Sequence, residues 1–257
     1  MQKAEELPEP LASSVAQAER FTFAFLNALR FVVQDASRDP GYFDSHILSY
    51  AAQDYIQSTM AFPLLIREGI HNVVRRELRF LLEMSIKICR IQQQDRTGKV
   101  EEKLTKFIET FDTTNISMQK QLPLKLLPDV ERTKFIKEVG RIYGETSSYV
   151  HWTSSQVAER IDLVDAGRTS GFESADDVDK LAVLLARTLS CCLVFLLHSV
   201  PEYVSGDLLV EIDGSSRRWA FSESMFLAHM DEYFDYKHER QKVLDAVKRA
   251  RWSQAKF

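Results

Sequence analysis

Glycine and proline are scarce in this sequence, with 9 and 7 residues among 257. So few backbone breakers over this length argue against a turn-rich β fold and favour long helices. Cysteine is scarcer still. The residues Cys89, Cys191 and Cys192 are odd in number, and their spacing fits neither a disulfide framework nor a zinc site. We therefore expect reduced cysteines in the core of a cytoplasmic protein.

The sequence also lacks a hydrophobic run long enough to cross a membrane. Its longest unbroken apolar stretch, residues 191–197, is far shorter than the roughly 20 residues that a span requires. Residues 1–10 lack the basic start and the apolar segment of a secretory signal. We expect a buried core helix around 191–197, no membrane association and a cytoplasmic location.

The motifs of several enzyme classes are missing. The sequence contains no P-loop, no Gly-x-Gly-x-x-Gly, no Gly-x-Ser-x-Gly and no His-Glu-x-x-His. Its histidines are scattered, and only residues 229–239 gather His, Asp and Glu locally. Asp231 and Asp235 lie there at helical spacing among aromatic residues, so we expect a solvated amphipathic face. No metal and no cofactor are predicted.

Charge is spread unevenly along the chain, although the net charge is only −4. Residues 67–99 contain eight basic and four acidic residues, and residues 237–257 contain seven basic and two acidic ones. Residues 159–179 contain two basic and seven acidic residues. With its glycines, this acidic segment predicts a surface loop, which ends where Ser174 caps the next helix.

The dominant pattern is apolar residues at helical spacing. It predicts helices over residues 12–36, 43–60, 67–94, 99–112, 129–151, 175–199 and 223–251. The second is expected to end before Pro63, and Asp129 is expected to cap the fifth. Asp213-Gly214, between two short β-prone runs, predicts a hairpin over 207–221.

These elements predict an all-α protein with an up-and-down helical bundle at its centre. We expect an N-terminal helix in residues 1–41 that docks on the core. The bundle itself is expected over residues 42–200. Residues 201–257 are expected to form a β-hairpin followed by a basic amphipathic helix.

Polar side chains on two of the predicted helices could meet in one seam. Arg79 and Glu83 are four residues apart and can pair on one face. Tyr143, Ser147 and His151 recur at steps of four on the later helix and could bond to that pair. A structural interpretation makes the seam a network that fixes helix register. A functional one makes His151 a general acid or base and an arginine a stabiliser of a phosphoryl transition state.

The basic C-terminal segment offers a second candidate site. Lys248, Arg249 and Arg251 could contact phosphates while Trp252 stacks on a base, so this segment is a candidate nucleic-acid-binding surface. Cations are also favoured at a helix C-terminus by the helix dipole. Packing on a neighbouring subunit is the alternative.

Two short motifs carry a family resemblance. The stretch VVRRELRFLLEMSIKICRI (73–91) and the later YGETSSYVHW (143–152) resemble uncharacterised bacterial helical proteins that look related to the HEPN superfamily. The resemblance covers about residues 43–200. It implies a bundle of four or five helices, often dimeric, and a place in toxin–antitoxin or antiphage systems. It also implies that the seam occupies the family's polar positions.

One departure bears on activity. Catalytic members carry an arginine and then a histidine after four to six residues, whereas nine residues separate Arg141 from His151 and three separate Arg67 from His71. We therefore expect an intracellular homodimeric module that binds RNA or a protein partner in bacterial stress or antiphage defence. The alternative is a metal-independent endoribonuclease that uses His151 with Arg79 or Arg141.

Overall fold

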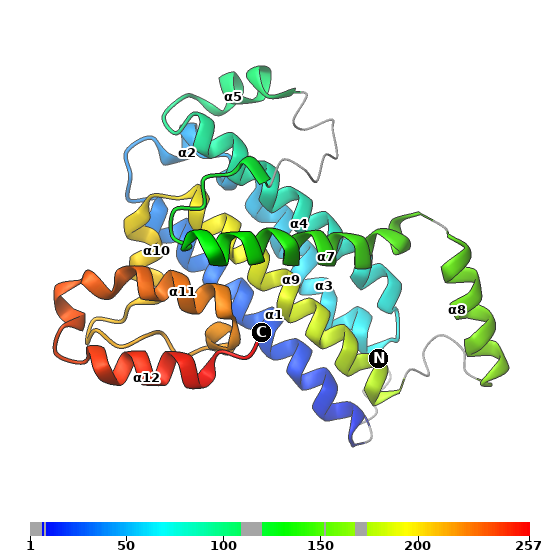
Figure 1. Ribbon diagram of the computed structural model, residues 1–257. Helices are drawn as coiled ribbons and strands as arrows, with labels where there is room; N and C mark the ends of the chain where they lie inside the picture. The colour runs from blue at the N-terminus through cyan, green and yellow to red at the C-terminus, as the bar shows by residue number, and fades with distance from the viewer. Residues whose placement is uncertain (1–6, 8, 109–119, 152, 168–173) are drawn as a thin grey trace, which may run out of the picture.

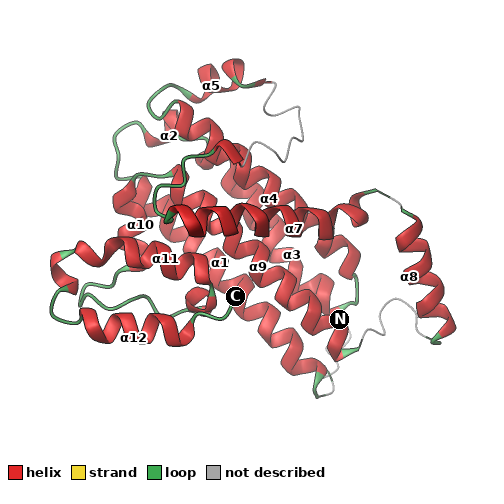
Figure 2. Ribbon diagram, viewed as in Figure 1, coloured by secondary structure: helices red, strands yellow, loops and turns green. Residues whose placement is uncertain are grey.

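The computed structural model describes residues 7, 9–108, 120–151, 153–167 and 174–257. Within these ranges the secondary structure is helical, and Figure 2 draws no strand in them. The all-α prediction is therefore confirmed for the described part of the chain. Whether the arrangement is the HEPN one stays a prediction.

Long helices make up the body of the molecule (Figure 1). They are α1 (Leu11–Ala36), α3 (Leu48–Arg67), α4 (His71–Gln94), α7 (Asp129–Val150) and α9 (Ala175–Ser199). Shorter helices are α2 (Tyr42–Ser45), α5 (Val100–Lys106), α8 (Ser154–Asp165), α10 (Glu202–Leu209), α11 (Met225–Tyr233) and α12 (Leu244–Gln254). The 3-10 turns η2 (Ala220–Glu223), η3 (Phe234–Tyr236) and η4 (His238–Arg240) lie around α11.

Helix α9 is the centre of the core. It begins at the predicted cap, where the Ser174 hydroxyl accepts from the backbone N–H of Asp177 and the Asp177 carboxylate accepts in return. It packs against α1, α4 and α7, and residues 191–197 are all buried. Among the described helices only α9 is long and apolar enough to cross a membrane, and 89% of its most apolar stretch is buried in the fold. The predicted core helix is therefore present.

The flanking helices bury their apolar stripes on α9. Phe21, Phe25 and Leu29 of α1 and Leu78 and Leu82 of α4 are all buried. Each such side chain contributes roughly 1.5–3 kcal/mol by leaving water. This packing, more than intrinsic propensity, holds the long helices in place.

The predicted end of the second helix before Pro63 is wrong. Helix α3 continues through Pro63 to Arg67. A proline inside a helix removes one backbone hydrogen bond. Phe62 and Ile66 on either side of it are buried in the core, and their burial offsets that cost.

The predicted hairpin is also wrong. The turn at Asp213-Gly214 forms, with Gly214 at φ 81°, but residues 202–209 before it belong to α10. One antiparallel bridge, Val210 to Ser216, is the β pairing in the described chain. An isolated two-stranded ribbon is marginal in water, whereas α10 buries Val204 and Leu208. Core packing therefore favours the helix.

The helix predicted over 223–251 is interrupted. Helix α11 ends at Tyr233, two 3-10 turns follow, and α12 starts at Leu244. The Ser224 hydroxyl caps α11 by accepting from the N–H of Leu227. The break lets α11 and α12 pack on each other, so charged residues of both face a shared interior.

Other boundaries differ from expectation. The acidic segment is not all loop, because α8 occupies residues 154–165, while 168–173 lie outside the described residues. The helix predicted over 99–112 is observed as α5, ending at Lys106, and 109–119 lie outside the described residues. Asp129 is the first helical residue of α7 and does not cap it. Pro128 stands at the N-cap position, without a side-chain hydrogen bond.

Candidate functional site

The predicted seam between α4 and α7 exists around Arg79. Its Nε donates to Oε1 of Glu83 at 2.5 Å, and its Nη1 donates to the carbonyl oxygen of Tyr143 at 3.2 Å. The guanidinium also lies over the ring of Tyr143, 3.2 Å from the centroid. Arg79 is buried and Glu83 partly so, so the charge of Arg79 is compensated inside the interface.

Tyr143 is the α7 side of this seam. Burial raises the pKa of its phenol, and the charge of Arg79 opposes that rise. The hydroxyl is therefore neutral at physiological pH. With a paired arginine and a neutral phenol, Arg79, Glu83 and Tyr143 form a satisfied contact between two helices.

His151 does not join this contact. Helix α7 ends at Val150, and His151 follows as the C-cap with extended backbone, φ −108° and ψ 131°. Its side chain is exposed, and Ser147 is half-buried one turn earlier. The expected stack of Tyr143, Ser147 and His151 therefore breaks at the helix end, because extended backbone turns the last side chain off the face.

A signal for this break was present in the sequence. Thr153 and Gln156 form a capping box that starts α8. The Thr153 hydroxyl accepts from the N–H of Gln156 at 3.4 Å, and the Gln156 amide oxygen accepts from the N–H of Thr153 at 3.3 Å. A threonine followed three residues later by glutamine marks a helix start. It implies that α7 has to end near His151.

Helix α8 follows the end of α7 (Figure 1), and its residues line cavities together with the N-terminal end of α4. Two adjoining cavities of about 260 and 350 Å³ lie there, and both are lined by Asn72, Arg76 and Arg160. Tyr149 and Gln156 line the larger one. We call this combined hollow the α4–α8 groove.

Arginines dominate the groove. Arg75 donates from Nη1 to Oδ1 of Asn72 at 3.0 Å, and its guanidinium lies over the ring of Tyr149, 4.6 Å from the centroid. Arg76 and Arg160 are exposed, and neither forms an ion pair with another residue in the described ranges. Two guanidinium groups that have no ion pair in the described part of the chain, beside a third that is held in place, favour an anionic ligand.

Two carboxylates also line the groove, and both have partners. Glu159 accepts from the hydroxyl of Tyr149 at 3.5 Å, and Asp177 caps α9. Burial raises the pKa of Tyr149, so its hydroxyl stays a neutral donor. Arginines therefore outnumber acids along the groove, in spite of the acidic net charge of the chain.

The expected C-terminal surface is only partly present. Lys248 and Arg249 of α12 are exposed. Arg251 is buried and donates from Nε to Oδ2 of Asp231 at 2.7 Å. Trp252 contacts the ring of His229 edge to face, with centroids 4.7 Å apart. Arg251 is therefore a structural residue and is removed from the predicted phosphate-binding set.

The expected solvated face at Asp231 and Asp235 is wrong for the same reason. Arg240 and Arg251 bind both carboxylates, and Arg240 is fully buried. Burial acts to raise the pKa of Asp235, but hydrogen bonds from Arg251 and Arg240 hold it below its usual value. No sequence pattern indicates this buried ion-pair cluster directly, because its four residues are spread over four helical elements, α11, η3, η4 and α12.

Within the described ranges, no three His, Cys, Asp or Glu side chains come together as a set that could hold a metal ion. The cysteines there are free and buried, as predicted. Neither a protein-family model, nor a curated protein, nor a solved structure matches the chain. The resemblance to the HEPN superfamily therefore rests on the two short motifs alone.

Proposed function

We propose that this protein is a helical RNA-binding module whose α4–α8 groove takes the phosphate backbone of a single strand. The observation that carries the proposal is the pair of exposed arginines, Arg76 and Arg160, which form no ion pair within the described residues and lie on two helices that line one groove. Arg75 and Tyr149 add a fixed guanidinium and an aromatic ring beside them. Cationic grooves with aromatic rings bind single strands through phosphates and stacked bases.

The remaining parts of the proposal rest on the resemblance. A role in bacterial stress or antiphage defence and a homodimeric state are what the two motifs imply. A cytoplasmic location accords with free, buried cysteines. Sedimentation velocity of the purified protein tests the dimer: a single species with the mass of one chain would reject it.

The decisive test of RNA binding is fluorescence anisotropy with a labelled single-stranded oligoribonucleotide over a range of salt concentrations. Arg76→Gln and Arg160→Gln are each expected to weaken binding and to reduce the salt slope by about 0.7, because each removes one cation that neutralises a phosphate. Lys125→Gln is the control, because Lys125 is exposed and lies outside the groove. RNA binding that neither arginine variant changes would contradict the groove assignment.

The same anisotropy titration distinguishes the α4–α8 groove from the C-terminal surface as the RNA site. Lys248→Gln and Arg249→Gln remove the exposed basic residues of α12. If these two variants abolish RNA binding while Arg76→Gln and Arg160→Gln still bind RNA, the predicted C-terminal surface is the RNA site. If wild-type protein binds no RNA at all, the RNA proposal fails and a protein partner becomes the function to pursue.

A metal-independent endoribonuclease is the second candidate, and the position of His151 favours it. The imidazole is exposed, and Tyr149 and Val150 just before it line the groove. For this reaction the imidazole has to reach the groove arginines, so that it moves a proton while they stabilise a phosphorane-like charge. Arg79 cannot serve here, since it is buried against Glu83.

Cleavage of total cellular RNA in EDTA tests this candidate. A folded His151→Ala variant should cleave about 10²–10⁴-fold more slowly if His151 is the general acid or base. Equal cleavage by wild type and variant would remove His151 from the mechanism. No cleavage by the wild type would leave binding as the function.

A further inference from the structure

A further cavity opens in the C-terminal part of the fold, apart from the proposed RNA groove. It measures about 260 Å³ and lies between residues 215–222, α11 and α12. Its apolar lining comes from α10, η2, α11 and α12, through Leu209, Phe221, Leu227 and Val247. Such a lining favours an apolar body over a hydrated ion.

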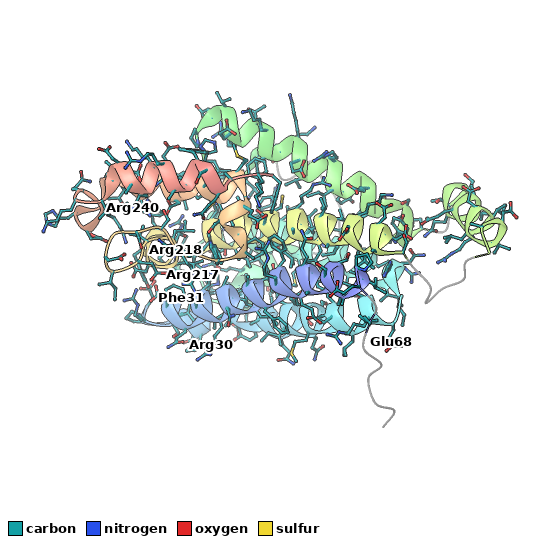
Figure 3. All side chains as sticks on the ribbon, turned by 90° about the horizontal axis from the view of Figure 1, so that it is seen from below. Arg30, Phe31, Glu68, Arg217, Arg218 and Arg240 are labelled. Atoms are coloured by element: carbon teal, nitrogen blue, oxygen red, sulfur yellow. The ribbon has the colours of Figure 1, made fainter. Side chains whose placement is uncertain are left out.

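The rim of this cavity is polar and basic. Ser215, Ser216, Arg217 and Arg218 line it, and Trp219 adds an indole wall. Arg217 has its guanidinium carbon 5.8 Å from the ring centroid of Phe31 and 5.6 Å from that of Trp219. Figure 3 shows Arg217 and Arg218 beside Phe31 at the end of the molecule opposite Glu68.

Neither rim arginine is held in an ion pair within the part of the chain that the structure describes. Arg217 and Arg218 form none with a described residue. Arg217 touches aromatic faces instead, which orient a guanidinium without cancelling its charge. The hydrogen bonds of Ser215, and to a smaller extent the charge of Arg218, lower the pKa of Asp213, but that carboxylate is exposed outside the cavity lining. Both guanidinium charges therefore remain to be met by a ligand or by solvent.

The one carboxylate that lines the cavity is already compensated. Asp231 accepts from Arg240 and from Nε of Arg251, and Asp235 accepts from both arginines as well. The charges of two acids and two arginines cancel. The uncompensated charge at the cavity is therefore positive, which disfavours a cationic ligand.

We propose that this cavity binds a small organic anion with a flat apolar body. Its carboxylate, sulfonate or phosphate group meets Arg217 and Arg218. Its body enters between Trp219 and the apolar floor. The volume of about 260 Å³ suits a compact ring system.

Two probes of similar shape and different charge test this. We would titrate the folded full-length protein with 8-anilinonaphthalene-1-sulfonate, an anion, and with N-phenyl-1-naphthylamine, its uncharged counterpart, and follow their fluorescence. The anion should bind saturably with one site per chain and at least tenfold more tightly than the neutral probe. Equal affinities, or no saturable binding of the anion, would overturn the proposal.

Substitutions in and around the cavity then test where the probes bind. Arg217→Gln and Arg218→Gln should each weaken anion binding several-fold while leaving the neutral probe unaffected. Lys242→Gln removes one exposed charge outside the cavity lining and should change neither. Ala250→Trp, at an exposed lining position of α12, should fill the cavity and reduce binding of both probes.

The arginine variants keep the test valid if the tryptophan variant fails to fold, because both arginines lie at the rim and hold no ion pair in the described chain. Their thermal unfolding should match that of the wild type. Anion binding that survives both arginine substitutions in folded protein overturns the assignment. RNA binding at the α4–α8 groove should be unchanged in them, so the two proposals fail independently.

Discussion

Arg251 of α12 donates to Asp231 of α11 across 2.7 Å, and both side chains are buried. The same guanidinium reaches Asp235, at 2.5 Å from its Nη2. The hydrogen bond from Arg251 to Asp231 joins α11 and α12, which the helical spacing of apolar residues predicts as one helix. The buried ion-pair cluster of Asp231, Asp235, Arg240 and Arg251 therefore fixes how the C-terminal part folds back on itself.

Arg251→Gln is expected to destabilise the protein by about 2–4 kcal/mol, because it leaves the buried carboxylate of Asp231 and the partly buried carboxylate of Asp235 to share Arg240. Urea unfolding followed by circular dichroism gives the free energy. The matched control is Arg249→Gln, an exposed arginine of the same helix, which should change it by less than about 0.5 kcal/mol. Equal effects of the two variants would show that the cluster stabilises the fold no more than a surface charge does.

Glu83→Ala is expected to cost about 1–3 kcal/mol. It removes the only carboxylate that meets Arg79 in the described structure and leaves that guanidinium on the Tyr143 carbonyl and ring. Glu102→Ala, an exposed glutamate of α5, is the comparison. An unchanged melting midpoint for Glu83→Ala would contradict the burial of the seam between α4 and α7.

Two buried histidines predict that stability decreases in mild acid. His46 accepts from the N–H of Leu48 and contacts the carbonyl of Ser199, and His198 accepts from the N–H of Leu126 and contacts the carbonyl of Val194. Burial lowers the pKa of each to about 4. Near His46, the charge of Lys103 lowers its pKa further and Asp39 opposes this.

The direction of the pH dependence follows from these lowered pKa values. Below the unfolded pKa of about 6.5, the unfolded state takes up protons that the folded state does not bind. Stability is therefore full above a pH of about 6.5 and falls as the pH drops toward about 4, by about 3 kcal/mol for each histidine. Urea unfolding at a series of pH values should show this slope. A His198→Gln variant should flatten it, while His238→Gln, at an exposed position, should not.

Replacing each of two glycines by alanine should change the stability of the protein in opposite directions. Gly144 lies within α7 with open space around its α-carbon, so Gly144→Ala should stabilise the protein by about 0.5–1 kcal/mol. Gly214 has a positive φ of 81°, and an added Cβ would overlap the carbonyl oxygen of Glu239. Gly214→Ala should therefore destabilise it by more than about 1 kcal/mol. Changes in unfolding free energy of the same sign for both would contradict the turn.

Local sequence patterns were sufficient to place the long helices. Apolar residues at helical spacing placed α1, α4, α7 and α9 within a few residues of their observed bounds, and Ser174 marked the start of α9. The contact between Arg79 and Glu83 was also predictable, since residues four apart on a helix are neighbours. These features depend on local geometry, which periodicity reports directly.

The other features depend on how distant segments pack together. Burial of side chains in the core keeps α3 helical beyond Pro63. It also stabilises α10 as a helix where the sequence favoured a strand. Packing of α12 on α11 buried Arg251, which composition had placed on a phosphate-binding surface. The α4–α8 groove joins Arg76 and Arg160, which lie on separate helices, and spacing along the chain carries no information about such a meeting. Long-range packing free energy outweighs local preference at each of these places.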